Sequence, residues 1–189
     1  GAGGTAAEWI SGGGSVRVET IAQATLIWVG GVTPRNWNNP NCWTNKLTGT
    51  HEVPVSGDIV QIKNDANQGC VNNLTGLSLK QIRFGGGYQN PSGNEVTLRA
   101  DSQGIYSDGY MFYNLPTAIE GRNLEFYASS MIDFRSGGLH SYDGQPCGFR
   151  KTGAGQLGIS PSGDWSGFKY ITHTVGSLLF GGQGSGNMS

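Results

Sequence analysis

Residues 151–160 read KTGAGQLGIS, and this stretch decides the fold class. Gly153 and Gly155 can take a positive φ at no steric cost, so they predict a sharp turn in the backbone. Leu157 and Ile159 then alternate with a glycine, as a strand with one buried face requires. Together with a second apolar run that follows a spacer, the stretch predicts turn, strand, turn, strand.

The order of residues in this region is also characteristic of a known repeat. The KTGAG segment is followed by a Gly-x-x-Tyr stretch at 167–170 and by GSLLFGG at 176–182. The three pieces together resemble the autotransporter-associated β-strand repeat of bacterial secreted passengers. In that family the segment forms one or two rungs of a right-handed parallel β-helix, so the resemblance implies an all-β, right-handed parallel β-helix or solenoid here.

Composition agrees with a folded, turn-rich chain. Glycine accounts for 33 of the 189 residues, more than twice the usual share of roughly 7%. The hydrophobic fraction is still 36%, which argues against a disordered or collagen-like polymer. We therefore expect one domain in which most glycines lie in turns.

The charge balance and the lengths of the apolar runs exclude two classes of partner. Lys and Arg number 12 against 13 Asp and Glu, which gives a formal net charge of -1. No basic field exists to hold nucleic acid, and no apolar run approaches the roughly 18 residues that span a bilayer. We expect neither nucleic-acid binding nor membrane insertion.

The chain divides into an arm and a solenoid. Residues 1–14 are rich in Gly, Ala and Ser and predict a flexible arm. Residues 15–57 predict a first strand and a cap, and residues 58–189 predict the rungs. The first strand alternates and is the candidate contact with a neighbouring subunit, through Val16, Val18, Thr20 and Ile21.

A tryptophan-rich segment precedes the rungs. Its order, Trp28-x-Gly-Gly, then Asn-Trp37, Trp43 and Val-Pro-x-x-Gly-Asp at 53–58, resembles the entry segment before the β-helix rungs of many bacterial cell-surface proteins. The Cys at 42 and a longer insert at 44–52 depart from that pattern. Two interpretations stay open: a sugar-stacking platform, or a cap over the end of the solenoid, which we favour because an uncapped end exposes apolar interior and free strand edges.

Short strands with turn residues between them are expected along the rest of the chain, and helix is expected to be nearly absent. Successive rungs need about twenty residues each, as in the spacing from Ile62 to Ile82 and from Leu98 to Ile119. The expected strands span 59–63, 77–84, 95–100, 123–128, 131–135, 156–160, 168–172 and 177–180. The expected inward residues are Ile62, Leu79, Ile82, Phe84, Val96, Leu98, Ile119, Leu124, Phe126, Ile132, Phe134, Leu157, Ile159, Ile171 and Leu179.

Cys42, Cys70 and Cys147 stand far apart with no Cys-x-x-Cys spacing, so a zinc site is not expected. In an oxidising compartment one pair forms a disulfide; otherwise all three remain thiols. The sequence leaves both possibilities open.

Catalytic chemistry has little support. Parallel β-helices often carry polysaccharide lyases and hydrolases, whose sites use carboxylates with an Arg or Lys base. The nearest candidates are Glu125 with Tyr127 on one strand and Asp133 with Arg135 on the next, and we favour a solvated cross-strand charge pair over a catalytic site there.

The remaining candidate groups also lack a recognisable setting. The histidines at 51, 140 and 173 have no nucleophile in a recognisable elbow, and the calcium nonapeptide of β-roll proteins is absent. We expect no enzyme activity, no cofactor and no metal.

The function expected from these observations is structural. We expect an extracellular or cell-surface solenoid that assembles with copies of itself into a filament, sheath or surface layer, by its N-terminal arm and end-to-end stacking. Two alternatives remain: a β-helix that binds or cleaves carbohydrate, with surface glycans as partners, and a fragment of an adhesin passenger.

Overall fold

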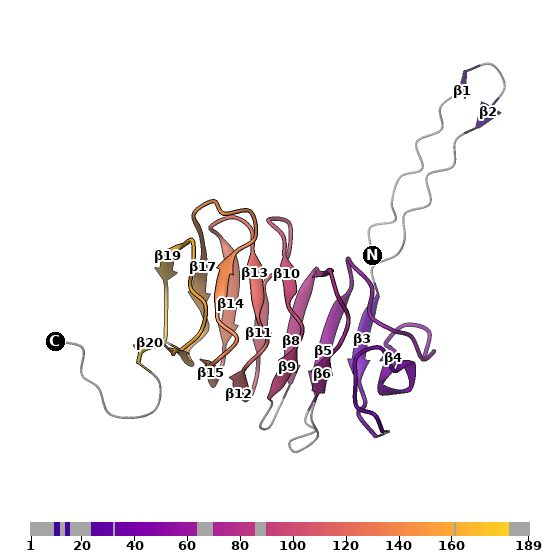
Figure 1. The fold of residues 1–189 in the computed structure, drawn as a ribbon, viewed down its shortest axis with the longest axis horizontal. Coiled ribbons are helices and arrows are strands. Elements are labelled where there is room, and N and C mark those ends of the chain that lie inside the picture. Colours follow the sequence, from indigo (N-terminus) through magenta and orange to yellow (C-terminus); the bar gives the residue numbers. More distant parts are fainter. Residues whose placement is uncertain are drawn as a thin grey trace.

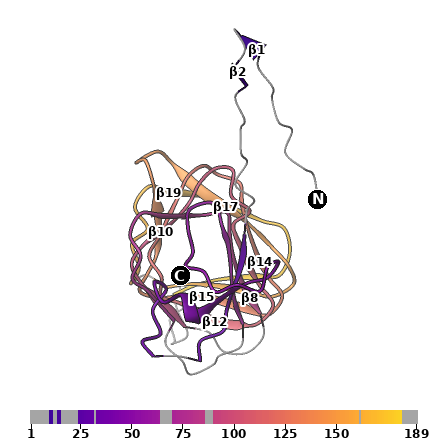
Figure 2. The ribbon, with the colours of Figure 1, turned by 90° about the vertical axis from the view of Figure 1, so that its right-hand side faces the viewer.

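A computed structural model describes residues 24–31, 33–63, 70–85, 90–160 and 162–181, and the backbone of 10–11 and 14–15. Parallel strands stack into a β-solenoid of about five turns, drawn side by side in Figure 1. The view along the stack shows the coils superimposed around a common interior (Figure 2). Within the described ranges the helical content is a single 3₁₀ turn, η1 at Pro40–Cys42. The all-β solenoid that the sequence predicts is confirmed.

The largest face of the solenoid is an eight-stranded sheet. Its strands are parallel except for β4, which pairs antiparallel with β3. In spatial order the sheet contains β19 (Phe168–His173), β17 (Cys147–Thr152), β14 (Leu124–Ala128), β11 (Ile105–Ser107), β8 (Gln81–Gly85), β5 (Ile59–Lys63), β3 (Thr25–Trp28) and β4 (Trp43–Asn45).

Two further faces complete each turn. The second face contains a two-stranded and a four-stranded sheet, joined where the Asn114 N–H donates to the Pro91 carbonyl; they are β6 (Cys70–Asn72) with β9 (Pro91–Gly93), and β12 (Tyr110–Tyr113), β15 (Met131–Phe134), β18 (Gln156–Ile159) and β20 (Ser177–Phe180). The third face contains β7 (Leu77–Leu79), β10 (Val96–Leu98), β13 (Thr117–Ile119) and β16 (Leu139–Ser141).

Parallel pairing places equivalent residues of successive turns above one another. Inward side chains therefore form continuous columns along the interior, as expected when side chains alternate between the two faces of each strand. One column on the large sheet runs through Leu26, Val60, Ile82, Ile105, Phe126 and Lys151, all of them buried.

Most of the expected inward residues are confirmed as core. All are buried except two in the last turn: Ile171 is half-buried and Leu179 is 40% exposed. Leu179 is a register error by one position, because Leu178 and Phe180 are the residues that continue the columns of Leu157 and Ile159.

The expected spacing of about twenty residues per rung is confirmed. Leu98 stands opposite Ile119. Ile62 pairs with Phe84, two residues beyond Ile82, and Ile82 itself stands opposite Val60. The expected strand at 77–84 is also divided, because the chain turns a corner at Lys80 between β7 and β8.

The structure confirms only part of what the KTGAG stretch predicts. Lys151 is not in the turn but in β17, while the expected alternation of Leu157 and Ile159 in β18 is confirmed. Gly153 has a φ of +77°, as expected. Gly155 has an ordinary φ and is required by space instead, because a Cβ there would lie 2.0 Å from the Ser130 carbonyl oxygen.

The N-terminal arm is described only in part. The backbones of β1 (Ile10–Ser11) and β2 (Gly14–Ser15) pair antiparallel with each other. The candidate contact residues Val16, Val18, Thr20 and Ile21 lie outside the described residues. No helix within the described ranges is long and apolar enough to cross a membrane.

Candidate functional site

The N-terminal end of the large sheet has a closed edge. β4 is its outermost strand, and the backbone groups that point away from β3 are all satisfied within the chain. Trp43 N–H donates to the Pro40 carbonyl and the Trp43 carbonyl lies 2.7 Å from His51 Nδ1. Asn45 N–H donates to the Thr50 carbonyl, and the Asn45 carbonyl accepts from Gly49 N–H. This edge therefore offers no free pairing groups on β4.

The other two faces are covered at the same end. Trp37 N–H donates to the Val71 carbonyl, and Val71 N–H donates to the Arg35 carbonyl, so the 35–37 segment lies along β6. Gly57 N–H donates to the Ser78 carbonyl and Ser56 Oγ accepts from Ser78 N–H, so β7 is covered as well. The first complete turn thus has a cap on each of its three faces.

The tryptophans form the interior of this cap. Trp28, Trp37 and Trp43 are each at most 2% exposed. The Trp43 ring meets the other two edge-on, with centroids 4.9 Å from Trp28 and 5.3 Å from Trp37. Trp43 Nε1 donates to the Trp37 carbonyl at 3.0 Å. None of these three indoles presents a free ring face to solvent, which a sugar-stacking platform needs.

A buried carboxylate joins the cap to the first turn. Asp58 accepts hydrogen bonds from the backbone N–H groups of Val55 and Ala24, at 2.9 and 3.2 Å. Burial raises the pKa of Asp58 above its ordinary value. The Val-Pro-x-x-Gly-Asp order of the sequence therefore fixes where the cap ends and the rungs begin.

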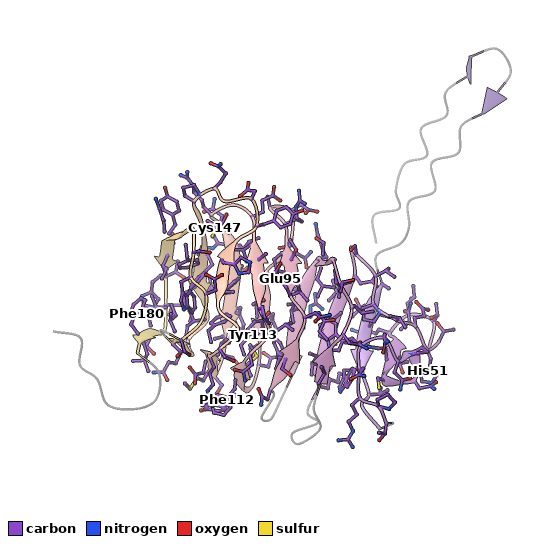
Figure 3. The ribbon with its side chains drawn as sticks, viewed as in Figure 1. His51, Glu95, Phe112, Tyr113, Cys147 and Phe180 are labelled. Atoms are coloured by element: carbon purple, nitrogen blue, oxygen red, sulfur yellow. The ribbon has the colours of Figure 1, made fainter. Side chains whose placement is uncertain are left out.

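The C-terminal end is built differently. β19 and β20 are the last strands of their sheets, and no other described strand pairs with their outer edges. Figure 3 shows Phe180 at this end and His51 at the opposite one. Phe180 and Val175 are each 49% exposed, because no further turn covers them in the described part of the chain. The end offers apolar side chains together with strand edges.

The third face ends differently from the other two. Ser141 N–H donates to the Ser166 carbonyl, and Gly138 bridges to Asp164. These contacts cover β16, so the open C-terminal edge is confined to β19 and β20. We call these two strands the open rung.

The carboxylates considered for a lyase lie on different faces. Glu125 and Tyr127 are outward residues of β14 in the large sheet, whereas Asp133 is on β15 in the second face. Glu125 accepts a hydrogen bond from Thr152 Oγ1 at 2.7 Å. The corner between β14 and β15 separates the two pairs, so the structure does not bring them together as one site.

The expected solvated charge pair of Asp133 and Arg135 is wrong in one respect. The Asp133 carboxylate points outward, as expected, but it is not solvated. It is 2% exposed, and its Oδ2 accepts from Arg135 Nε at 3.0 Å. The Arg135 guanidinium in turn lies 3.1 Å from the centroid of the Phe112 ring. Arg135 and Phe112 thus shield this carboxylate on the outside of the second face, where Figure 3 labels Phe112.

The histidines remain apart from one another. His173 Nε2 lies 3.0 Å from the Gly176 carbonyl. His140 lies between two carboxylates, with Nε2 2.9 Å from Glu95 Oε2 and Nδ1 3.9 Å from Asp164 Oδ2. Among the residues that the structure describes, no group of three or more His, Cys, Asp or Glu is arranged to hold a metal ion.

The three cysteines are buried at two distant places. Cys70 Sγ accepts a hydrogen bond from Trp37 Nε1 at 3.0 Å, and Cys42 Sγ lies 3.7 Å from the Pro34 carbonyl, so both contact the same capping segment. Cys147 lies on β17, four turns away from β6. Burial raises the pKa of the Cys42 and Cys147 thiols.

Sequence reasoning missed two features of this arrangement. Lys151 continues an inward column although it is charged, and the Ser177–Phe180 strand directs its second Leu outward. The sequence carries a signal only for the second: the strand has apolar residues at both parities, so an alternative register could have been stated.

Comparison with known proteins adds no identification. No family model, curated protein or solved structure matches this chain. The resemblance to the autotransporter-associated repeat is therefore a proposal, and the fold defines the molecule as a capped β-solenoid.

Proposed function

We propose that this chain is an extracellular structural protein that assembles with copies of itself through strand addition to its open rung. The incoming strand comes from the N-terminal arm or the first strand, which together span residues 1–23, of the next copy. The single observation that carries the proposal is the contrast between a closed first turn and an open last one.

The open rung has the properties of a strand acceptor. An uncovered strand edge is a template for pairing with another chain, and main-chain hydrogen bonds supply much of the affinity in such complexes. The half-exposed Phe180, Leu179 and Val175 add apolar area beside that edge. With a net charge of -1 there is little long-range repulsion between copies.

The closed cap determines which element acts as donor. Because the outward groups of β4 are already used, the first turn cannot pair edge to edge with the open rung of a neighbour. The arm and the first strand precede the cap, and Ser15–Gln23 alternates as a strand does. Contact between two different surfaces gives a filament when the rotation between copies does not close a ring, and this open arrangement is the one proposed.

The extracellular location rests on the resemblance to secreted passengers. The open rung is an argument for self-assembly, and it says nothing about the compartment in which the protein is found. The competing arrangement is that the arm folds back and caps its own subunit.

Deleting residues 1–23 tests the proposal. Sedimentation velocity and electron microscopy of the full chain are expected to show filaments that grow with concentration, and the deletion variant is expected to stay a folded monomer. The variant still has an open rung but no donor, so added to the full chain it should block one filament end and shorten the filaments. Undiminished filaments from the variant, or a full chain that stays monomeric at high concentration, contradict the proposal.

A further inference from the structure

A row of outward side chains crosses the large sheet perpendicular to its strands. Parallel pairing places one outward position of each turn above the next, at the spacing of about 4.8 Å between strands. The residues of this row are Gln61, Arg83, Tyr106, Tyr127 and Thr152. None of them is used by the cap or by the open rung.

The two tyrosines of the row stack on each other. The ring centroids of Tyr106 and Tyr127 are 4.6 Å apart, and the ring planes differ by 5°. One face of the Tyr106 ring is therefore covered by Tyr127. The other face looks toward the turn that carries Arg83.

The Arg83 side chain does not stack on the second face of the Tyr106 ring. Its Nε donates a hydrogen bond to Gln81 Oε1 on the same strand, which directs the guanidinium along its own strand. Gln81 Nε2 in turn lies 3.3 Å from the Gln103 carbonyl, which it reaches as a donor. These bonds hold the polar groups beside the row and leave space next to Tyr106.

A hollow of about 290 Å³ occupies that place. Its lining residues are Gln61, Gln81, Arg83, Phe84, Tyr106 and Asp108. The hydrogen bond to the exposed Asp108 carboxylate is the main cause that raises the pKa of the Tyr106 hydroxyl. An aromatic ring face thus stands beside two amides, a guanidinium and a carboxylate.

We propose that this hollow binds one pyranose ring of a neutral polysaccharide. The C–H groups on one side of a pyranose are weakly positive and pack on the negative face of an aromatic ring, here Tyr106. Amide, carboxylate and guanidinium groups serve sugar hydroxyls as both donors and acceptors. The volume is at the lower limit of about 300 Å³ for small-molecule sites, which suits a single ring.

The charges of the lining select against an acidic sugar. Arg83 and Asp108 carry opposite charges, so the hollow has no net charge to attract a uronic acid. The same balance favours hydroxyl groups, which need both a donor and an acceptor. The inference does not rest on self-assembly, because the row is complete within one copy.

Titration calorimetry of the full chain tests this site. The probes are the hexasaccharides of β-1,4-linked glucose, mannose, xylose and N-acetylglucosamine, and of α-1,4-linked glucose, with hexagalacturonate as the acidic comparator. We expect at least one neutral probe to bind with a Kd of about 1 mM or below, and hexagalacturonate to bind more weakly. No binding of any neutral probe at about ten times that concentration, or a preference for hexagalacturonate, overturns the proposal.

Two variants place the binding in the hollow. Tyr106→Ala removes the stacking face and should weaken binding by at least about tenfold. Tyr142→Ala, which removes an exposed tyrosine that packs on Arg99 elsewhere, should leave it unchanged. If Tyr106→Ala fails to fold, Asp108→Ala at an exposed position replaces it, with a severalfold loss expected. Unchanged binding in a folded hollow variant also overturns the proposal.

Discussion

The ammonium group of Lys151 lies 2.7 Å from the carbonyl oxygen of Gly153, and Lys151 follows five apolar residues in its inward column. The same Nζ donates to the Thr152 carbonyl at 2.7 Å and to the Val175 carbonyl at 3.2 Å. No carboxylate is among these partners, and burial lowers the pKa of Lys151. The lysine therefore ties two successive turns together through backbone carbonyls at one corner of the solenoid.

Replacing that lysine should loosen the corner. We expect Lys151→Met to lower the free energy of unfolding by about 1 to 3 kcal/mol, since carbonyls are left without a donor while apolar bulk is kept. The matched control is Arg150→Met on the exposed side of the same strand, with a change within about 0.5 kcal/mol. Chemical denaturation measures both, and a Met variant as stable as wild type would show that the carbonyls do not need the ammonium group.

Adjacent residues of β15 should respond very differently to truncation. Phe134 is fully buried between the Tyr113, Phe126 and Trp165 rings, so Phe134→Ala is expected to cost about 3 to 5 kcal/mol. Asp133→Ala should cost less than that, because the Arg135 guanidinium left behind is partly exposed and can be solvated, so that no unpaired charge stays buried. Equal losses in denaturation experiments would contradict the register of this strand.

Stability at alkaline pH should depend on Tyr113. The side chain is fully buried, its hydroxyl lies 2.7 Å from Thr117 Oγ1, and burial raises the pKa of Tyr113 above its ordinary value. Above about pH 10 the unfolded chain loses a phenolic proton that the folded protein keeps. The stabilisation is therefore complete below about pH 10 and is lost as the pH rises toward the folded-state pKa.

The Tyr113→Phe variant lacks the phenolic proton. Comparing it with wild type therefore isolates the effect of Tyr113 from that of other groups that titrate at alkaline pH. Relative to the variant, wild type should lose up to about 1.4 kcal/mol per pH unit above about pH 10. Denaturant titrations of both proteins between about pH 8 and 11 measure the difference. Parallel curves over that range would mean that the Tyr113 pKa is not raised.

The positions of the cysteines restrict which disulfide can form within one chain. Cys70 and Cys147 are four turns apart, or about 19 Å at the usual strand spacing, whereas bridged Cα atoms lie within about 7 Å. Only Cys42 and Cys70 share a neighbourhood. Peptide mapping of the oxidised monomer should therefore find Cys147 as a thiol, and an intramolecular disulfide that includes Cys147 would contradict the order of the turns.

The sequence predicted the solenoid where side-chain alternation was unambiguous. In β18 the glycine between Leu157 and Ile159 leaves one parity apolar, and the structure places both residues inside. In β20 the order Ser-Leu-Leu-Phe is apolar at both parities, so pairing with β18 decides the register and Leu179 faces outward. Strands of three residues, such as β11 and β13, are too short to show a period at all.

The candidate sites were less predictable because they depend on where the chain turns corners. Glu125 and Asp133 are close in the sequence, but the corner between β14 and β15 directs them to different faces. The inward position of Lys151 depends in part on the Val175 carbonyl from the next turn, which no local pattern contains. The tyrosine stack likewise depends on the exact register of β11 against β14.

Charge placed at each end of the solenoid tests the proposed assembly most directly. Phe180→Lys puts a cation on the open rung, and Leu47→Lys makes the same change at the closed end, where Leu47 is 88% exposed. An inward-pointing charge at a strand edge opposes pairing with another chain. By sedimentation velocity at matched concentrations, wild type and Leu47→Lys should form filaments while Phe180→Lys remains a folded monomer. Equal assembly of the two variants, or assembly lost only in Leu47→Lys, would contradict the account.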